Sequence, residues 1–187
     1  MWGIILRRYC LVGVKGIGKT TLIDAIKSSV PNVEFIIGST VLKELVGEKF
    51  SNFDYFSVEE KEFYRKKAIQ FFENKQKSSQ KKILIDGHVT LYNPKNGMVE
   101  VVFTKEDSEF YTDLILYDTN VEIIYNRRKN DYLKKRIIDK EIIEKEILSE
   151  RRESKNMAQK FGMKFHIIDG RNFDKAKSQF ITILNEE

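Results

Sequence analysis

The stretch LVGVKGIGKTTLIDAI, residues 11–26, decides the fold of this chain. It places three of the chain's ten glycines, Gly13, Gly16 and Gly18, between an apolar run and a run with helical spacing. Glycine adopts backbone conformations that side chains forbid, so a strand that ends here can turn tightly into a helix. The backbone N–H groups of such a turn converge, and the dipole of the following helix adds to their attraction for an anion. The stretch therefore predicts a phosphate-binding loop between a strand and a helix.

Residues 13–20 follow the pattern G-x-x-x-x-G-K-T, in which the last two positions have defined chemical tasks. Lys19 offers a mobile positive charge to the β- and γ-phosphates of a nucleoside triphosphate, and the Thr20 hydroxyl is a ligand for Mg²⁺. Asp86 ends the apolar run ILID and is an acid of the type that orients Mg²⁺ through its water shell. We therefore expect ATP and Mg²⁺ as cofactors, with Thr20 and Asp86 at the metal.

His88 follows Asp86 in the sequence IDGH. Two interpretations are open: the imidazole polarises a water or contacts a substrate, or it belongs to a surface hairpin. Residues 88–103, HVTLYNPKNGMVEVVF, predict a hairpin because two β-prone stretches flank Asn96 and Gly97.

Elsewhere, apolar runs alternate with helix-like segments. Strands are expected at Tyr9–Val12, Val33–Ile37, Ile83–Asp86, Leu114–Asp118 and KFHII, residues 164–168. Helices are expected from Lys19 to before Pro31, near Val41–Val46, and from Phe173 to Leu184. Two more should begin at capping boxes, one at Ser57 and Glu60 and one at Thr119 and Glu122. A further helix should run from Lys140 to a C-terminal cap at Gly162. The alternation predicts a three-layer α/β fold with a mainly parallel sheet.

Two of these helices have an apolar face that suits burial against a sheet. In the helix that follows Ser57, this face contains Tyr64, Ala68, Phe71 and Phe72. In the helix that begins at Lys140, it contains Ile143, Ile147, Met157 and Phe161.

The length of 187 residues favours one domain, 1–187, with one core. The 33 basic residues are interleaved with 28 acidic ones, as on a solvated surface, so the net charge of +5 does not establish nucleic-acid binding. Cys10 is the only cysteine in the sequence, which excludes an internal disulfide and a cysteine zinc site. The start MWGIILRRYC lacks the pattern of a secretory signal, and we expect a cytoplasmic protein without membrane contact.

The segment from Arg127 to Arg136 is strongly basic. A flap of this kind that closes over a triphosphate would neutralise charge in the transition state and exclude water. The alternative is a solvated helix end, where positive charge favours the helix dipole. We favour the flap because a phosphate loop is present.

The motifs VGVKGIGKTT, IDGH and YDTNVEIIYNRRKND, followed by a long helix, resemble the P-loop nucleoside monophosphate kinases. The resemblance is to archaeal-type adenylate kinases in particular, and to the related atypical adenylate kinases that assist small-ribosomal-subunit maturation. It implies a P-loop NTPase fold, with a five-stranded, mainly parallel sheet in the order 2-3-1-4-5 and helices on both faces. It also implies an acceptor-binding region at about 38–78 and a short lid at about 127–140.

The same resemblance assigns residues to the ATP site. The ATP phosphates would be bound by Gly13, Gly16, Ile17, Gly18, Lys19, Thr20 and Thr21. Arg128 and Arg136 would be lid arginines that take part in catalysis with Lys19. The adenine would lie near Gly170, Arg171 and Asn172.

The acceptor site is implied in the same way, with one departure. Gly38, Ser39 and Thr40 would border the acceptor pocket, and His88 would act on the acceptor. The family usually carries an acceptor-binding arginine between the second strand and the next long helix, but residues 47–57 here read GEKFSNFDYFS. Arg65, on the helix, would take its place.

The leading hypothesis is therefore an ATP-dependent phosphotransferase, an adenylate-type nucleoside monophosphate kinase with a small-molecule acceptor. The alternative is a P-loop ATPase coupled to a protein or ribonucleoprotein partner. The missing arginine favours the ATPase, whereas the absence of an aromatic-rich basic platform disfavours direct RNA contact. A GTPase is disfavoured: TKED, residues 104–107, fits the guanine-reading pattern, but Val89 breaks the D-x-x-G that should begin at Asp86.

Overall fold

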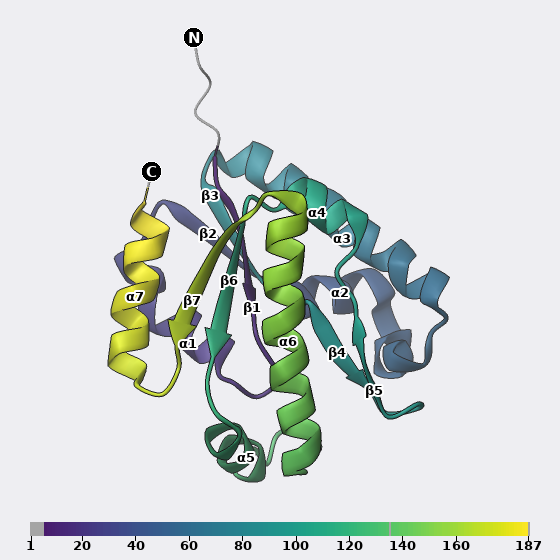
Figure 1. The fold of residues 1–187 in the computed structure, drawn as a ribbon. Helices are drawn as coiled ribbons and strands as arrows, with labels where there is room; N and C mark the ends of the chain where they lie inside the picture. The colour runs from purple at the N-terminus through teal and green to yellow at the C-terminus, as the bar shows by residue number, and fades with distance from the viewer. Residues whose placement is uncertain (1–5, 135, 187) are drawn as a thin grey trace.

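Five parallel strands form the central sheet of the computed structural model, which describes residues 6–134 and 136–186. Their spatial order is β2-β3-β1-β6-β7 (Figure 1). The strands are β1 (Arg8–Val12), β2 (Val33–Ile37), β3 (Lys82–Asp86), β6 (Asp113–Asp118) and β7 (Lys164–Asp169). Counted within this sheet, the order is 2-3-1-4-5, as the resemblance implied. Residues 1–5, 135 and 187 of the expected domain lie outside the described residues.

Helices cover both faces of the sheet (Figure 1). They are α1 (Lys19–Ile26), α2 (Gly38–Val46), α3 (Val58–Ser79), α4 (Lys105–Phe110), α5 (Val121–Lys129), α6 (Lys140–Phe161) and α7 (Phe173–Asn185), with 3-10 segments η1 (Lys27–Ser29) and η2 (Gly47–Tyr55). In the part of the chain that the structure describes, none of these helices is both long and apolar enough to cross a bilayer.

The core has two parts, one on each face of the sheet. Successive residues of β1 point to opposite faces: Tyr9 and Leu11 pack with α1 and α7, while Cys10 and Val12 pack with α3, α4 and the end of α6. A strand buried on both faces needs a continuous apolar run, which is why the strands were recognisable in the sequence.

A second, two-stranded sheet confirms the hairpin prediction. Strands β4 (Thr90–Asn93) and β5 (Met98–Val101) pair antiparallel, with Asn93 opposite Met98. Gly97 has φ +70°, which glycine adopts without strain. The hairpin follows the loop after β3 and lies beside α6 (Figure 1).

The helix starts were predicted with mixed success. Ser57 forms a capping box with Glu60, as expected. The capping box predicted at Thr119 is wrong, because α5 is capped one residue later: the Asn120 side chain accepts a hydrogen bond from the backbone of Ile123 at 3.0 Å. Asparagine caps a helix as well as threonine does, so the spacing alone did not decide between them.

Two apolar faces differ by single residues from the prediction. In α3 the buried residues are Ala68, Ile69 and Phe72, whereas Phe71 is 40% exposed. Phe161, in the last turn of α6, is 38% exposed, because Ala158 and Met163 fill the space against the sheet there. Tyr64 of α3 is half-buried against Phe53 and Phe56, whereas Ile143, Ile147 and Met157 of α6 pack in the core as expected.

Residues 104–107, which resemble a guanine-reading motif, form the N-terminal cap of a helix. The Thr104 hydroxyl accepts a hydrogen bond from the Asp107 backbone, and the Asp107 carboxylate accepts from the Thr104 backbone N–H at 2.7 Å. This capping box begins α4. The GTPase interpretation therefore loses the motif on which it depended.

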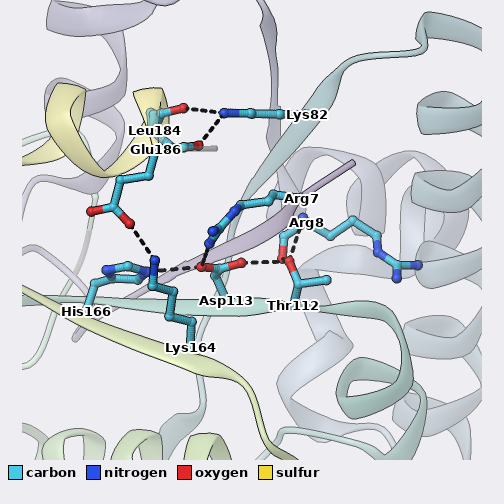
Figure 2. Close-up of polar contacts among 9 residues, drawn as sticks. All are labelled: Arg7, Arg8, Lys82, Thr112, Asp113, Lys164, His166, Leu184 and Glu186. Atoms are coloured by element: carbon cyan, nitrogen blue, oxygen red, sulfur yellow. Dashed lines mark hydrogen bonds and ion pairs between the residues drawn. The ribbon is translucent and has the colours of Figure 1, made fainter. Parts of the chain in front are cut away.

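A polar cluster joins the strands at the amino edge of the sheet, where they begin (Figure 2). The Asp113 carboxylate accepts from Arg7 at 2.8 Å and from the Thr112 hydroxyl at 2.7 Å, and it lies 3.0 Å from Nε2 of His166. Burial alone would raise the pKa of Asp113. The contacts with His166, Thr112 and Arg7 outweigh burial and leave the pKa below its ordinary value.

The end of α7 is attached to the same edge (Figure 2). Lys164 pairs with the Glu186 carboxylate at 2.6 Å. Lys82 donates to the backbone carbonyls of Leu184 and Glu186 at 3.0 and 2.6 Å. The amino ends of β3 and β7 are thus linked to the end of the C-terminal helix.

We expect Asp113→Asn to lower the free energy of unfolding at pH 7 by about 1–3 kcal/mol, since a charged acceptor is lost from a buried site. Because the folded-state pKa is lowered, the contribution of Asp113 is present above about pH 3.9 and is lost as the pH falls through the folded-state pKa. Urea unfolding of wild type and variant between pH 3 and pH 7 should show the difference shrinking toward acid.

The matched control is Asp24→Asn, which removes a surface pair of Asp24 with Lys27. Its free energy of unfolding should change by less than about 0.5 kcal/mol. Equal losses in the two variants would contradict a special role for the buried cluster.

Candidate active site

The loop between β1 and α1 has the geometry of a phosphate-binding loop. Gly13, Gly16 and Gly18 all have positive φ, at +149°, +88° and +97°, and Gly18 lies immediately before α1. A Cβ on Gly13 would approach the carbonyl oxygen of Tyr117 to 2.7 Å. The glycines are therefore required both by conformation and by close packing.

Lys19, Thr20 and Asp86 come together at the carboxyl edge of the sheet, where the strands end. The Lys19 ammonium donates to the carbonyl of Gly13 at 2.7 Å and lies 3.5 Å from the Asp86 carboxylate. The Thr20 hydroxyl lies 3.3 Å from the other carboxylate oxygen of Asp86. The pattern in the sequence therefore predicted a real spatial cluster.

Thr20 and Asp86 also suit the expected magnesium ion. Magnesium takes oxygen ligands and usually keeps several waters, so a nucleotide-bound ion needs only one or two protein groups. A hydroxyl and a carboxylate on adjacent chain segments meet that need.

His88 lies beside this cluster and lines the same cavity. Burial, and then the charges of Lys19 and Lys15, hold its pKa well below the ordinary value. The imidazole is therefore neutral at pH 7. Its Nδ1 atom is buried and has no hydrogen-bond partner among the described residues, so it can bond to a ligand.

Glu150 supports the phosphate loop from α6. Its carboxylate accepts hydrogen bonds from the backbone N–H groups of Gly13, Val89 and Thr90, at 3.1, 3.1 and 2.6 Å, and from the Thr90 hydroxyl. The side chain is only 1% exposed. It therefore fixes the loop after β1 and the loop after β3 to the same helix.

Sequence reasoning missed Glu150, although a signal was present. The buried polar residues of α6 are Glu146, Glu150 and Ser154. They follow Ile143 and Ile147 at spacings of three and four, and so lie on the apolar stripe. A charge on an apolar stripe is rare unless it is paired, and that rarity would have marked these residues for attention.

Arg128, expected over the phosphates as a lid arginine, instead lies behind the loop. It is 3% exposed and donates twice to the carbonyl of Lys15, at 3.0 and 2.8 Å. It also pairs with Glu146 at 2.7 Å and donates to the carbonyl of Ile137 at 3.2 Å. Burial raises the pKa of Glu146, against the opposing charge of Arg128. Arg128 thus positions the phosphate loop and does not line the cavity.

The neighbouring residue Arg127 takes the place expected of Arg128. It lines the cavity and donates to the carbonyl of Ile17. Arg136 also lines the cavity, as expected, and pairs with Asp131 at 3.1 Å. Helical spacing turns adjacent residues by about 100°, so a one-residue difference decides which arginine faces the cavity.

One large cavity, of about 960 Å³, runs from the phosphate loop into the space between α3 and the hairpin. The lining residues that the sequence predicted are Gly16, Ile17, Gly18, Lys19, Thr20, Thr21, Gly38, Ser39, Arg65, Asp86, His88 and Arg136. Beyond Gly38 and Ser39 the lining is apolar and aromatic, apart from Arg65 and Asp107. We call this part the acceptor compartment; its other residues are Leu42, Phe50, Phe53, Ala68, Ile69, Phe72, Leu91, Val102 and Tyr111.

Besides Gly13 and Arg128, four expected residues lie outside the lining of the cavity. They are Thr40, Gly170, Arg171 and Asn172. Arg171 pairs with Asp169 at 2.7 Å and lowers the pKa of that carboxyl to about 2. Asn172 caps α7. The residue that reaches the cavity from this segment is Phe173.

The strand-loop-helix geometry, with Lys19, Thr20 and Asp86 together, defines a P-loop protein. Residues 12–147 match the family AAA_17, an AAA domain, and the chain belongs to that family. A search of the curated proteins finds no match.

Several solved structures share the fold. A sugar kinase from a Janibacter species is 13% identical, with a TM-score of 0.63, over 96% of this chain and 95% of that one. A shikimate kinase from Acinetobacter baumannii, in complex with shikimate, is 16% identical, with a TM-score of 0.58, over 96% and 94%. A deoxyadenosine kinase from M. mycoides with bound dATP is 14% identical, with a TM-score of 0.57, over 96% and 100%.

These likenesses confirm the predicted three-layer P-loop fold. The adenylate-kinase subtype stays a prediction.

We expect Glu150→Gln to weaken the binding of ATP–Mg²⁺ about tenfold or more, which corresponds to about 1.4 kcal/mol. The variant keeps the volume of the side chain, but its NH₂ group meets backbone donors instead of accepting from them. Isothermal titration calorimetry of folded protein would measure the change.

Glu144→Gln is the control, since Glu144 lies on the exposed side of the same helix. It should bind ATP–Mg²⁺ as wild type does. An unchanged dissociation constant in folded Glu150→Gln would show that α6 does not hold the loop in its binding conformation.

Proposed function

We propose that the protein is an ATP-dependent phosphotransferase that moves the γ-phosphate of ATP to a small acceptor. The observation that carries this proposal is the continuity of the cavity. Lys19, Thr20 and Asp86 lie at one end, and the acceptor compartment opens directly from them. A donor nucleotide and a second ligand would therefore meet at Asp86.

The phosphate loop and the lid would provide electrostatic stabilisation. Backbone N–H groups and the Lys19 ammonium would hold the phosphates, and Arg127 and Arg136, which also line the cavity beside the loop, would add positive charge. Thr20 and Asp86 would hold Mg²⁺, which would neutralise further phosphate charge. Phosphoryl transfer needs little more than such positioning.

His88 would orient the acceptor. Its neutral imidazole presents an unpartnered Nδ1 atom next to Asp86, so it can hydrogen-bond to the attacking group without adding charge. We include His88 in the acceptor site with Gly38 and Ser39, which border the same space. The acceptor region is then about 38–78, and the lid about 127–140.

The sequence resemblance favours a nucleoside monophosphate as the acceptor. Arg65 lines the acceptor compartment and so reaches the space that the missing family arginine would serve. The neighbouring structures widen the choice, since their names include a shikimate kinase and a deoxyadenosine kinase. An assay must therefore offer acceptors of several chemical kinds.

The second candidate is a P-loop ATPase coupled to a protein or ribonucleoprotein partner. His88 favours it, because an imidazole with an unpartnered nitrogen can also orient a water molecule. The acceptor compartment disfavours it, because hydrolysis does not need an aromatic cavity beside the phosphate loop.

We expect Lys19→Ala to lower kcat by about 10²–10³-fold, the usual cost of losing one charge-stabilising group at the reacting centre. The assay follows ADP, inorganic phosphate and the phosphorylated acceptor together, with ATP–Mg²⁺ and a panel of sugars, nucleosides, nucleoside monophosphates and shikimate.

Lys27→Ala removes an exposed lysine just after the same helix and should leave kcat unchanged. Release of phosphate with no phosphorylated acceptor would support the ATPase instead. Full activity in Lys19→Ala would refute both functions.

A further inference from the structure

The acceptor compartment contains two opposite charges that do not pair. Arg65 on α3 and Asp107 on α4 both line the cavity, yet no ion pair or hydrogen bond joins them in the part of the chain that the structure describes. One oxygen of Asp107 accepts from the backbone and the hydroxyl of Thr104, at 2.7 and 2.8 Å. A hydrogen-bond donor and an acceptor of opposite charge therefore border the same cavity.

Burial removes part of the hydration of both charged side chains, which costs free energy. Burial is the main cause that lowers the pKa of Arg65 and the main cause that raises the pKa of Asp107. Buried charges are stable when they are paired or hydrogen-bonded. A ligand that accepts from Arg65 and donates to Asp107 would offset part of this cost.

The walls of the compartment suit a flat ring. Phe50 and Phe53 are stacked, with ring centroids 5.8 Å apart, and Phe72 and Tyr111 line the same space. A cavity of about 960 Å³ can hold a donor nucleotide together with a second ligand. An aromatic acceptor would gain both apolar burial and ring contacts here.

The reacting end of the compartment does not favour a second phosphate. The cations that line the cavity near the phosphate loop include Lys15, Lys19, Arg127 and Arg136, which belong to the loop, to the start of α1 and to the lid. Among the described residues, Arg65 is the one cation that the acceptor compartment itself contributes, and the charge acting most strongly on it is that of Asp107. The group that meets the γ-phosphate is therefore better matched by a neutral hydroxyl.

Resting on the proposed function, we infer that the acceptor is a nucleoside, with its base among the aromatic side chains and the base edge bridging Arg65 and Asp107. Nucleobases carry hydrogen-bond donors and acceptors side by side on one edge, which is the combination these two residues require. The sugar hydroxyl then points to Asp86 and His88.

The reaction balances as a simple transfer. The hydroxyl oxygen forms a bond to the γ-phosphorus, and the bond from that phosphorus to the β–γ bridging oxygen breaks, with its electron pair leaving on ADP. The hydroxyl proton is released to water. The products are a nucleoside monophosphate, ADP and a proton.

The first test compares adenosine, deoxyadenosine, guanosine, cytidine and thymidine with their 5′-monophosphates and with shikimate, each with ATP–Mg²⁺. We expect kcat/KM for at least one nucleoside to exceed that for its monophosphate, and for shikimate, at least tenfold. Preference for a monophosphate or for shikimate would overturn the inference and leave the phosphotransferase intact. Phosphate release without any phosphorylated product would overturn the proposed function itself.

The second test uses Arg65→Gln and Asp107→Asn. Each should raise KM for the nucleoside at least tenfold and change KM for ATP less than twofold, because both residues lie away from the phosphate loop. Asparagine keeps a side-chain oxygen for the Thr104 backbone, so the start of α4 is preserved. Lys67→Gln, on the exposed side of α3, is the control and should leave both constants unchanged.

Arg65→Lys keeps the charge but not the planar group, and it serves if Arg65→Gln does not fold. It should also raise KM for the nucleoside. An unchanged KM for the nucleoside in folded variants would refute base recognition by this pair.

Discussion

The carboxylate of Glu150 is the constraint on which the carboxyl edge of this protein depends. This one side chain of α6 accepts hydrogen bonds from the backbone N–H groups of two loops, one after β1 and one after β3. A buried charge of this kind is stable because several hydrogen bonds satisfy it, and removing those bonds would leave an expensive unpaired group. The same carboxylate therefore sets the phosphate loop and the start of the hairpin in one fixed relation. The donor site and one wall of the acceptor compartment are built as a unit.

The features that the sequence predicted well are those with a local cause. The strands follow from short apolar runs, and the phosphate loop follows from glycines whose positive φ angles allow the turn into α1. Asp86 could be placed because the carboxyl ends of parallel strands meet at one edge, so an acid after β3 must lie near the end of β1. The hairpin at Gly97 follows from turn chemistry alone.

The features that the sequence did not reveal depend on how a helix is rotated about its axis and on contacts between residues that are far apart in the sequence. Arg127 and Arg128 are neighbours in the chain, and only the packing of α5 against α6 turns the first toward the cavity and buries the second against Glu146. The residues predicted to lie near the adenine, Gly170, Arg171 and Asn172, do not line the cavity, for a similar reason. Arg171 bonds locally to Asp169, and Phe173 reaches the cavity instead. The acceptor compartment draws on α2, α3, α4 and the hairpin, which lie far apart in the sequence, so no single motif could describe it.

The two edges of the sheet have different roles: the amino edge carries stabilising contacts, and the carboxyl edge carries the cavity. The cluster around Asp113 joins the beginnings of the strands, Lys82 and Lys164 attach the end of the last helix there, and none of these residues lines the cavity at the opposite edge. Distant sites of this kind change stability and chemistry almost independently. A scaffold so arranged is evolvable: it can be made more heat-resistant at one end while the other end is retuned for a new substrate.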